Sequence, residues 1–154
     1  MKIQFLKAEE KDIPHILEMM EEFNAIDNYP FDKTRTRENL LDFLNNENLG
    51  RAWIIKNGGQ SIGYIVLGFG FSFEHNGRDA FIDELFLKPD YRHKGIGKLA
   101  IDFIFEQAPV LGVHVIHLEV EQHNKAASML YLKKGFTDNG RILLSKKLEV
   151  SPGG

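Results

Sequence analysis

Residues 82–104, IDELFLKPDYRHKGIGKLAIDFI, place an apolar strand, a glycine loop and a helix in succession. The strand is apolar except for Asp83 and Glu84, as expected of a strand inside a sheet. From Ile96 to Ile104, apolar residues recur three and four positions apart, which predicts a helix with one buried stripe. A strand followed by such a helix leads to a parallel neighbour, so this stretch decides the fold class.

Further strands and helices are predicted on both sides of this stretch. Strands alternate apolar and polar residues, whereas helices repeat them with a period of about 3.6. Asn57 and Gly58 are expected to supply the positive φ angles of a hairpin turn, and Thr34 or Thr36 to cap the second helix. Gly135 is expected to stop the last helix. The expected strands are 2–8, 50–57, 60–71, 79–88, 113–120 and 141–148, and the expected helices are 12–26, 37–46, 96–104 and 124–134.

The order of these elements, βαα-βββ-α-β-α-β, defines an α/β protein. Hairpin neighbours are antiparallel, whereas the unit around the glycine loop makes strands 79–88 and 113–120 parallel. We therefore expect a mixed, mostly antiparallel central sheet with helices on both faces. Because 154 residues suffice for one ordinary core, residues 1–150 are expected to form a single domain and residues 151–154 a disordered tail.

Composition excludes several classes of protein. The chain has no cysteine, and hence no disulfide, thiol nucleophile or thiolate metal site. A net charge of −3 argues against a nucleic-acid partner. The chain has no apolar run of about 18 residues and no apolar stretch at its start, so we expect no membrane contact and a cytoplasmic location. None of the six histidines pairs at a metal-ligating spacing, so no metal is expected.

The loop before the helix at Ile96 is suited to a phosphate group. A helix start leaves backbone N–H groups unpaired and carries the positive end of the helix dipole. Gly95 and Gly97 lack side chains that would hold an anion away from those donors. A tight turn with solvated basic side chains explains the loop equally well. The basic residues beside the glycines are Arg92, His93, Lys94 and Lys98.

Two familiar phosphate loops fit this stretch poorly. A Walker loop requires another glycine spacing and a hydroxyl after its lysine. The dinucleotide pattern Gly-x-Gly-x-x-Gly/Ala fits GIGKLA, with acidic Glu119 and Glu121 about 20 residues further on. In that motif, however, the glycines follow the first strand almost at once, whereas here KPDYRHK intervenes and several elements come before it.

A third pattern, Arg/Gln-x-x-Gly-x-Gly/Ala, fits Arg92–Gly97. The segment HLEVEQHNKAASMLYLKKGF, residues 117–136, follows it. With both segments in this order and spacing, the chain resembles the GNAT superfamily of coenzyme A dependent N-acetyltransferases. The resemblance extends to the element order of nearly the whole chain. It implies a GNAT-like acyl-CoA N-acyltransferase fold, with acetyl-CoA as cosubstrate and a small-molecule or peptide primary amine as acceptor. Homodimerisation is left open.

The resemblance also assigns residues to the cofactor. In the family, the pyrophosphate of acetyl-CoA lies on the glycine loop, and the pantetheine arm lies between two strands that splay apart. Asn124 matches a family asparagine that contacts the cofactor, although it is equally well placed as a helix cap. The cofactor-binding residues implied in this way are Leu85, Phe86, Leu87, Arg92, His93, Lys94, Gly95, Ile96, Gly97, Lys98 and Asn124.

The implied reaction is direct attack of the amine on the thioester, which needs a base and an acid. Tyr131 matches the tyrosine that protonates the departing thiolate, and its alternative is a core aromatic. Glu84, inside an apolar strand, is the first candidate base; its alternative is a buried ion pair. Glu119 is the second candidate, since some relatives use that position. Asp83 would point to the opposite face from Glu84 unless a bulge intervenes.

The acceptor is expected near the loop between the first two helices. Tyr29, Phe31 and Asp83 are the predicted substrate-binding residues, and nearby carboxylates suit a cationic amine with an apolar part. A different class of function stays open. The same fold could serve as a non-catalytic CoA-binding sensor or partner module.

Overall fold

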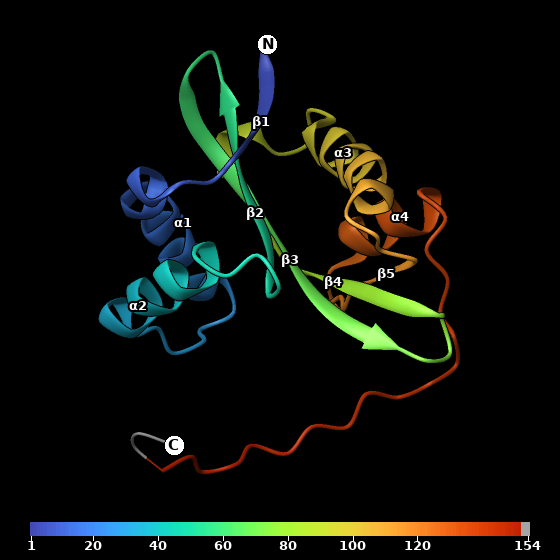
Figure 1. The fold of residues 1–154 in the computed structure, drawn as a ribbon. Coiled ribbons are helices and arrows are strands. Elements are labelled where there is room, and N and C mark those ends of the chain that lie inside the picture. The colour runs from blue at the N-terminus through green and yellow to red at the C-terminus, as the bar shows by residue number, and fades with distance from the viewer. Residues whose placement is uncertain (152–154) are drawn as a thin grey trace.

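Five strands form one sheet in a computed structural model that describes residues 1–151 (Figure 1). The sheet order follows the chain order. Neighbouring strands are antiparallel from β1 to β4, whereas β4 and β5 are parallel. The strands are β1 (Ile3–Lys7), β2 (Gly50–Asn57), β3 (Gln60–Ser72), β4 (Gly77–Leu87) and β5 (Val115–His117). The predicted mixed, mostly antiparallel sheet is confirmed; of the predicted tail, residues 152–154 lie outside the described residues.

Helices cover both faces of this sheet. In Figure 1, α1 and α2 lie on one side, and α3 and α4 lie on the other. Two short 3₁₀ turns, η1 and η2, precede α1 and the glycine loop. The bounds are η1 (Glu10–Asp12), α1 (Ile13–Ile26), α2 (Lys33–Leu44), η2 (Pro89–Tyr91), α3 (Ile96–Val110) and α4 (Lys125–Lys133). Among the described helices, none is long and apolar enough to cross a bilayer.

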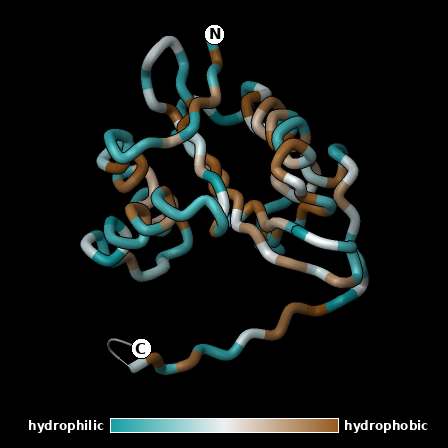
Figure 2. Tube along the Cα trace, in the orientation of Figure 1, coloured by the Kyte–Doolittle hydropathy of each residue, from teal (hydrophilic) through white to brown (hydrophobic). Residues whose placement is uncertain are grey.

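The two layers of helices create two hydrophobic clusters. Alternate residues of β3 enter them: Ile65 and Leu67 face α3, whereas Tyr64 and Val66 face α1 and α2. Figure 2 shows the resulting hydrophobic centre, with hydrophilic stretches toward the outside. Because β3 is covered on both faces, its sequence is a nearly continuous run of apolar residues.

The cap of α2 and the turn between β2 and β3 differ from the predictions, whereas the end of α4 agrees with them. Asp32 caps α2 by accepting a hydrogen bond from the Arg35 N–H at 3.0 Å, so the prediction of a threonine cap was wrong. The hairpin between β2 and β3 turns at Gly58 and Gly59, with φ of 58° and 92°. Asn57 is the last paired residue of β2, so the predicted turn is displaced by one position. Gly135, with φ of 94°, follows the end of α4 as predicted.

The prediction of a last strand over residues 141–148 was wrong. This segment is exposed and without regular structure, and it leads away from the sheet in Figure 1. The predicted strand 113–120 is likewise reduced to β5. The reason is the same in both cases: alternation marks which side chains could be buried, but a strand also needs a neighbour for its backbone N–H and C=O groups. β5 pairs with β4 over only three residues.

Candidate active site

The edge of β4 that faces β5 is open over half of its length. Pairing with β5 covers only Asp79–Phe81, and no strand of residues 1–151 pairs with the rest of that edge. Phe86 lies opposite Tyr64 and directs its backbone toward β3. The Leu87 carbonyl faces the other way, since it accepts a hydrogen bond from Arg92 Nε at 2.8 Å. Leu85 shares the direction of Leu87, so these two residues present backbone groups at the open edge.

A bulge in β4 sets the direction of Glu84. Val66 of β3 lies opposite Glu84, but the next residue, Leu67, lies opposite Ile82. Asp83 is therefore the extra residue, and it is exposed. Because of the shift, Ile82 packs toward α3, whereas Glu84 faces Tyr64 on the α1 and α2 side. A bulge at this place is the condition under which the direction of Asp83 was predicted to differ from that in a regular strand.

The Glu84 carboxyl lies in an apolar setting with one hydrogen-bond donor. The Tyr64 hydroxyl, on a fully buried side chain, donates to Glu84 Oε1 at 2.6 Å. Burial raises the pKa of Glu84 above its ordinary value; the Tyr64 hydrogen bond opposes this shift, and the nearby Asp83 charge adds to it. None of the described ion pairs includes Glu84. A carboxylate with a raised pKa is a stronger proton acceptor than an ordinary surface glutamate.

Tyr64 was missed by sequence reasoning. It lies within the apolar run of β3 and was treated there as an ordinary strand residue. Its pairing with Glu84 depends on the bulged register between β3 and β4, which no local pattern reports. A tyrosine in an otherwise apolar run is the one available signal, because a buried hydroxyl needs a hydrogen-bond partner.

Tyr131 and Glu119 have different surroundings. Tyr131 of α4 is half-buried, with its ring against that of Phe136 at a centroid distance of 5.9 Å. Burial raises the pKa of the Tyr131 hydroxyl, so it keeps its proton at neutral pH, as a proton donor must. Glu119 is exposed and lies beyond the end of β5. These surroundings favour Glu84 over Glu119 as a base.

The two glycines of the loop have different structural roles. Gly95 adopts a left-handed conformation, with φ of 81°, directly before α3, and no side chain caps the helix start. The backbone donors of the first turn are therefore accessible to an anion. Gly97 lies inside the helix, where a Cβ atom would approach Leu130 Cδ2 of α4 at 3.2 Å. Gly95 thus permits the turn, and Gly97 permits close packing of α3 against α4.

The basic residues of the loop divide into two groups. Arg92 is half-buried; besides its bond to the Leu87 carbonyl, its guanidinium lies over the Phe86 ring at 5.4 Å. It therefore braces the loop against β4. The basic side chains that remain exposed around the start of α3 are those of His93, Lys94 and Lys98.

The loop between α1 and α2 contacts the segment that leads into α4. The Tyr29 hydroxyl donates to Glu121 Oε1 at 2.6 Å, and this hydrogen bond raises the pKa of Tyr29. Asp27 Oδ1 lies 3.5 Å from His123 Nε2. These contacts join parts of the chain more than 90 residues apart, and sequence reasoning did not find them.

The other predicted residues lie around the same region. Phe31 is partly buried against the cluster of α1 and α2, and Asp83 is exposed beside Glu84. Asn124 caps α4 by accepting a hydrogen bond from the Ala127 N–H at 3.1 Å. The capping role of Asn124 is thus confirmed, and its contact with the cofactor stays a prediction. In the part of the chain that the structure describes, no cluster of three or more His, Asp or Glu side chains could hold a metal ion.

A mixed sheet that opens beside a bulged strand, with a glycine loop leading into α3, defines an α/β fold of the acyltransferase type. A sequence profile of the acetyltransferase (GNAT) family matches residues 16–136, which is more than half of the chain. The chain belongs to this family, as its sequence predicts. The expected enzyme class, an acyltransferase dependent on acetyl-CoA, is the class of its family.

Individual relatives agree with this assignment. An uncharacterized N-acetyltransferase of Bacillus subtilis, YycN, is 36% identical over 75 residues, which cover 49% of this chain and 47% of that protein. A thialysine N-ε-acetyltransferase of Bos taurus is 34% identical over 91 residues, 56% of this chain and 54% of that protein. The match thus spans about half of each of these relatives. A solved integron cassette protein from the Cole Harbour salt marsh metagenome has a TM-score of 0.86 at 31% identity, covering 96% of this chain and 92% of that one.

Proposed function

We propose that this protein transfers the acetyl group of acetyl-CoA to a primary amine by direct attack of the amine on the thioester. The observation that carries the proposal is the setting of Glu84. Its carboxyl has a raised pKa, and a bulge orients it beside the open edge of β4. Family membership supplies the acyl donor, and Glu84 supplies a base close to where that donor would lie.

The residues at the site fit acetyl-CoA. Uncapped backbone donors at the start of α3 suit its pyrophosphate, and the positive charges of Lys94 and Lys98 add to the attraction. The backbone groups of Leu85 and the N–H of Leu87 suit the pantetheine arm, which would pair along the strand edge like an additional strand. Arg92 then holds the loop in place, because its guanidinium is bonded to the Leu87 carbonyl.

The proposed chemistry assigns one proton to each of two side chains. Acetyl-CoA supplies a thioester carbonyl, to which the amine nitrogen forms a bond while the carbon–sulfur bond breaks. The nitrogen of a cationic amine loses two protons in this reaction. Glu84 accepts the first, directly or through water, so that the neutral amine can attack, and the second replaces the proton that Tyr131 gives up. Tyr131 donates its hydroxyl proton to the departing sulfur, and its raised pKa keeps that proton available at neutral pH. The products are an amide and free coenzyme A.

The proposed acceptor is a small molecule or peptide in which an apolar part carries a cationic amine. Asp83 is exposed beside Glu84, and the aromatic residues Tyr29 and Phe31 lie in the loop between α1 and α2. Two other acidic residues of this loop are already engaged, since Asp27 contacts His123 and Asp32 caps α2. The bovine relative is named for thialysine, an amine of this kind. A cytoplasmic location stays a prediction.

An acceptor screen tests the proposal. The full chain would be mixed with acetyl-CoA and single primary amines, including thialysine, lysine, polyamines and lysine-containing peptides. Because the chain has no cysteine, a thiol reagent reports free coenzyme A alone. Tyr131→Phe should lower kcat on the order of 10²-fold while the affinity for acetyl-CoA changes little.

The non-catalytic alternative makes the opposite prediction. A CoA-binding sensor would be stabilised by acetyl-CoA in thermal unfolding, yet no amine of the panel would release coenzyme A. That combination of results would replace the enzymatic function with a binding function.

A further inference from the structure

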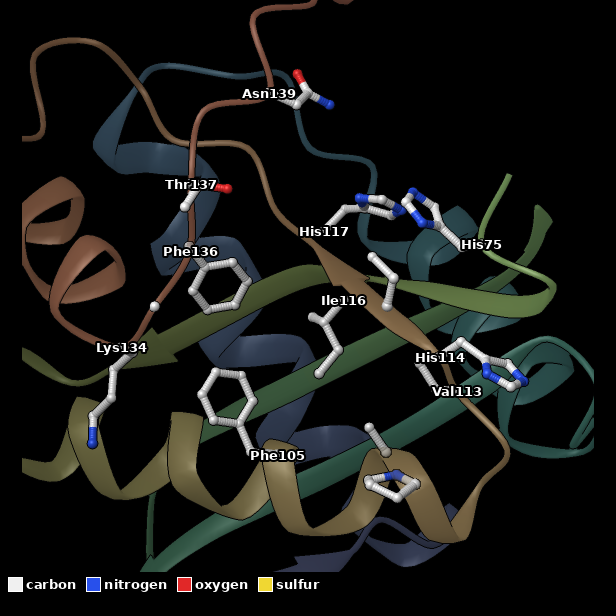
Figure 3. Close-up of a pocket in the computed structure, with 14 residues that line it drawn as sticks. His75, Phe105, Val113, His114, Ile116, His117, Lys134, Phe136, Thr137 and Asn139 are labelled. Carbon is white, nitrogen blue, oxygen red and sulfur yellow. The ribbon is translucent and has the colours of Figure 1, made fainter. Parts of the chain in front are cut away.

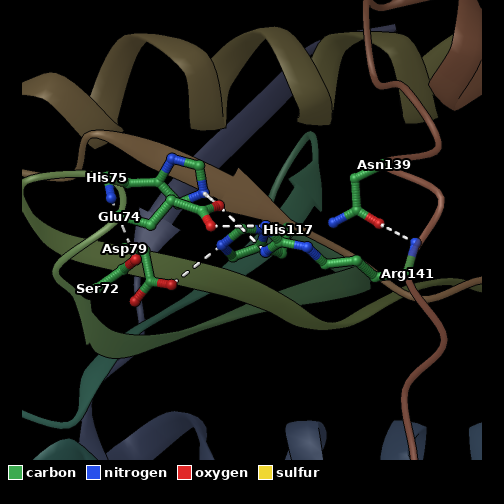
Figure 4. Close-up of polar contacts among 7 residues, drawn as sticks. All are labelled: Ser72, Glu74, His75, Asp79, His117, Asn139 and Arg141. Carbon is green, nitrogen blue, oxygen red and sulfur yellow. Dashed lines mark hydrogen bonds and ion pairs between the residues drawn. The ribbon is translucent and has the colours of Figure 1, made fainter.

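The charged side chains around β5 have partners within the protein. A cavity of about 440 Å³ lies between β5, α3 and the chain after α4 (Figure 3). His117, which lines this cavity, has Nε2 3.0 Å from Asp79 Oδ2, and the Arg141 guanidinium forms two bonds to the Glu74 carboxylate at 2.7 and 3.1 Å (Figure 4). These charged groups satisfy one another, so they need no ligand.

A second cavity, of about 520 Å³, lies where α1 begins. Residues of η1 and α1 line one side of it, and the ends of β2 and β3 with the first residue after β4 line the other. Its volume is in the range of sites for small molecules. Neither Glu84, Tyr131 nor any of residues 92–98 lines it, so this α1 cavity is separate from the proposed active site.

The sheet side of the α1 cavity carries two lysines. Ile54 and Phe86 pack toward α1, and side chains alternate along a strand, so Lys56 and Lys88, two residues further on, face the same way. Ser61 lies opposite Lys56 in the pairing of β2 with β3 and adds a hydroxyl group. Both lysines are partly buried, yet none of the ion pairs within residues 1–151 includes either of them.

The helix side of the cavity carries two carboxylates. Asp12, His15 and Glu18 follow one another at spacings of three, which places neighbours side by side. Asp12 is only 7% exposed, and its Oδ2 accepts a hydrogen bond from the Glu9 N–H at 2.9 Å. In the part of the chain that the structure describes, every buried side-chain oxygen has a partner, and none is found for Asp12 Oδ1, so this oxygen is open to solvent. Lys11 is already paired with Glu9, at 3.3 Å.

The opposite charges on the two sides of the cavity do not reach each other. Among the described residues, no ion pair joins Asp12 or Glu18 to Lys56 or Lys88. Partly buried charges without partners are costly, and each would be stabilised by a ligand group of opposite sign. An inorganic anion would satisfy the lysines alone and be repelled by the carboxylates, whereas a simple amine would do the reverse. A ligand that carries both charges suits both sides.

We propose that the α1 cavity binds a small zwitterion, namely an α-amino acid with an uncharged polar side chain. Its carboxylate would lie beside Lys56 and Lys88, and its ammonium group beside Asp12 and Glu18. The remaining lining is largely polar and includes the Ser61 hydroxyl, which suits a polar side chain better than an apolar one. The site is distinct from that of acetyl transfer and does not depend on it.

Calorimetric titration tests this proposal. The full chain, without acetyl-CoA, is titrated separately with L-serine, L-threonine, L-asparagine and L-glutamine, and at least one should bind. The N-acetyl derivative of the binder lacks the ammonium charge and its amide lacks the carboxylate, so each should bind about tenfold more weakly or worse. Equal binding of the N-acetyl derivative, or of inorganic phosphate, would indicate a simple anion site and overturn the proposal. Absence of binding by all four amino acids would also overturn it.

Matched variants locate the bound amino acid. Lys56→Gln and Glu18→Gln each remove one charge from one side of the cavity, and each should weaken binding roughly tenfold. Lys2→Gln and Glu21→Gln make the same changes at exposed side chains outside the lining and should leave binding unchanged. Equal losses in the variants and their controls would refute the assignment to this cavity.

A comparison with Glu84 separates this site from the proposed active site. Glu84→Gln should lower acetyl transfer and leave amino-acid binding unchanged, whereas Lys56→Gln should weaken amino-acid binding and leave acetyl transfer unchanged. Loss of amino-acid binding in Glu84→Gln would place the amino acid at the proposed active site and overturn this inference. A chain that binds the amino acid but transfers no acetyl group would refute the proposed function and leave the α1 cavity as a binding site.

Discussion

Two regions of this molecule have similar sequence patterns but different packing. The body, formed by β1–β4 with α1–α3, buries strand residues such as Ile65 and Leu67 completely. In the C-terminal region, residues 113–151, the equally apolar Ile142 and Leu144 are exposed. The difference does not lie in the side chains themselves. It lies in whether helices and neighbouring strands cover them. Hydrophobic periodicity therefore shows which side chains can be buried, but burial also needs another part of the structure, or another chain, to cover them.

The proposed active site lies where these two regions meet. The body contributes Glu84 and the glycine loop, and the C-terminal region contributes Tyr131 and the segment that Tyr29 contacts. A well-packed region is suited to shift the pKa of a carboxyl by burial. A less buried region can admit and release a ligand at lower cost in free energy.

The largest effect is expected at Glu84. Replacement by Gln removes the proton acceptor while keeping the size of the side chain, and should lower kcat/KM by about 10²- to 10⁴-fold. Glu119→Gln, the matched change in the C-terminal region, should lower it less than about threefold. Steady-state kinetics with the best acceptor of the screen measure both. If Glu119→Gln proved the more damaging change, the base would belong to the C-terminal region.

The pH dependence sharpens this prediction. Because burial raises the pKa of Glu84, kcat/KM should begin to fall at a pH above the ordinary range of a glutamate as the solution is acidified. Tyr64→Phe removes the hydrogen bond that lowers this pKa, so the acid limb should move to higher pH. An acid limb that does not move would argue against Glu84 as the titrating base.

Replacement of Glu84 should raise the stability of the protein, although it lowers the activity. A carboxyl whose pKa is raised by folding favours its neutral form in the native state, so its contribution to stability is present at low pH and is lost as the pH rises through the raised value. Glu84→Gln is therefore expected to raise the melting temperature at neutral and alkaline pH, with a smaller gain in acid.

The second-largest effect is expected on the free energy of unfolding, when a buried leucine of β3 is compared with an exposed leucine of α4. Leu67→Ala in the body should lower the free energy of unfolding by about 2–5 kcal/mol, because it leaves a cavity in a fully buried place. Leu132→Ala, the same change on α4 at a side chain that is 62% exposed, should alter it by less than about 0.5 kcal/mol. Urea unfolding with a constant m-value compares them. A cost at Leu132 similar to that at Leu67 would show that α4 is covered after all.

The smallest effect is expected at Tyr29. Tyr29→Phe removes the hydrogen bond from the loop between α1 and α2 to Glu121 and keeps the ring. KM for the acceptor should rise on the order of threefold, with kcat nearly unchanged, because the loop loses one exposed contact. Glu121→Gln should have a similar but weaker effect, since an amide can still accept the hydrogen bond. A loss in kcat instead would place Tyr29 closer to the reaction than the loop contact implies.

The sequence alone determined the family, the order of the elements as far as α4, and most of their limits. Local signals sufficed there: the period of apolar residues, Gly135 after α4, and the spacing from Arg92 to Gly97 together with residues 117–136. These signals act within a few residues of the chain, so they are readable without knowing what lies beside them.

Only the tertiary structure decided which residues contact one another. The bulge at Asp83 turns Glu84 toward Tyr64, the loop between α1 and α2 contacts Glu121, and the segment 141–148 is left without a neighbour. Each of these outcomes depends on strand register, or on contacts between residues far apart in the chain, which a periodic pattern does not encode. A raised pKa at Glu84 likewise arises from burial by other elements, so the chemistry proposed for this carboxyl is a property of the folded chain.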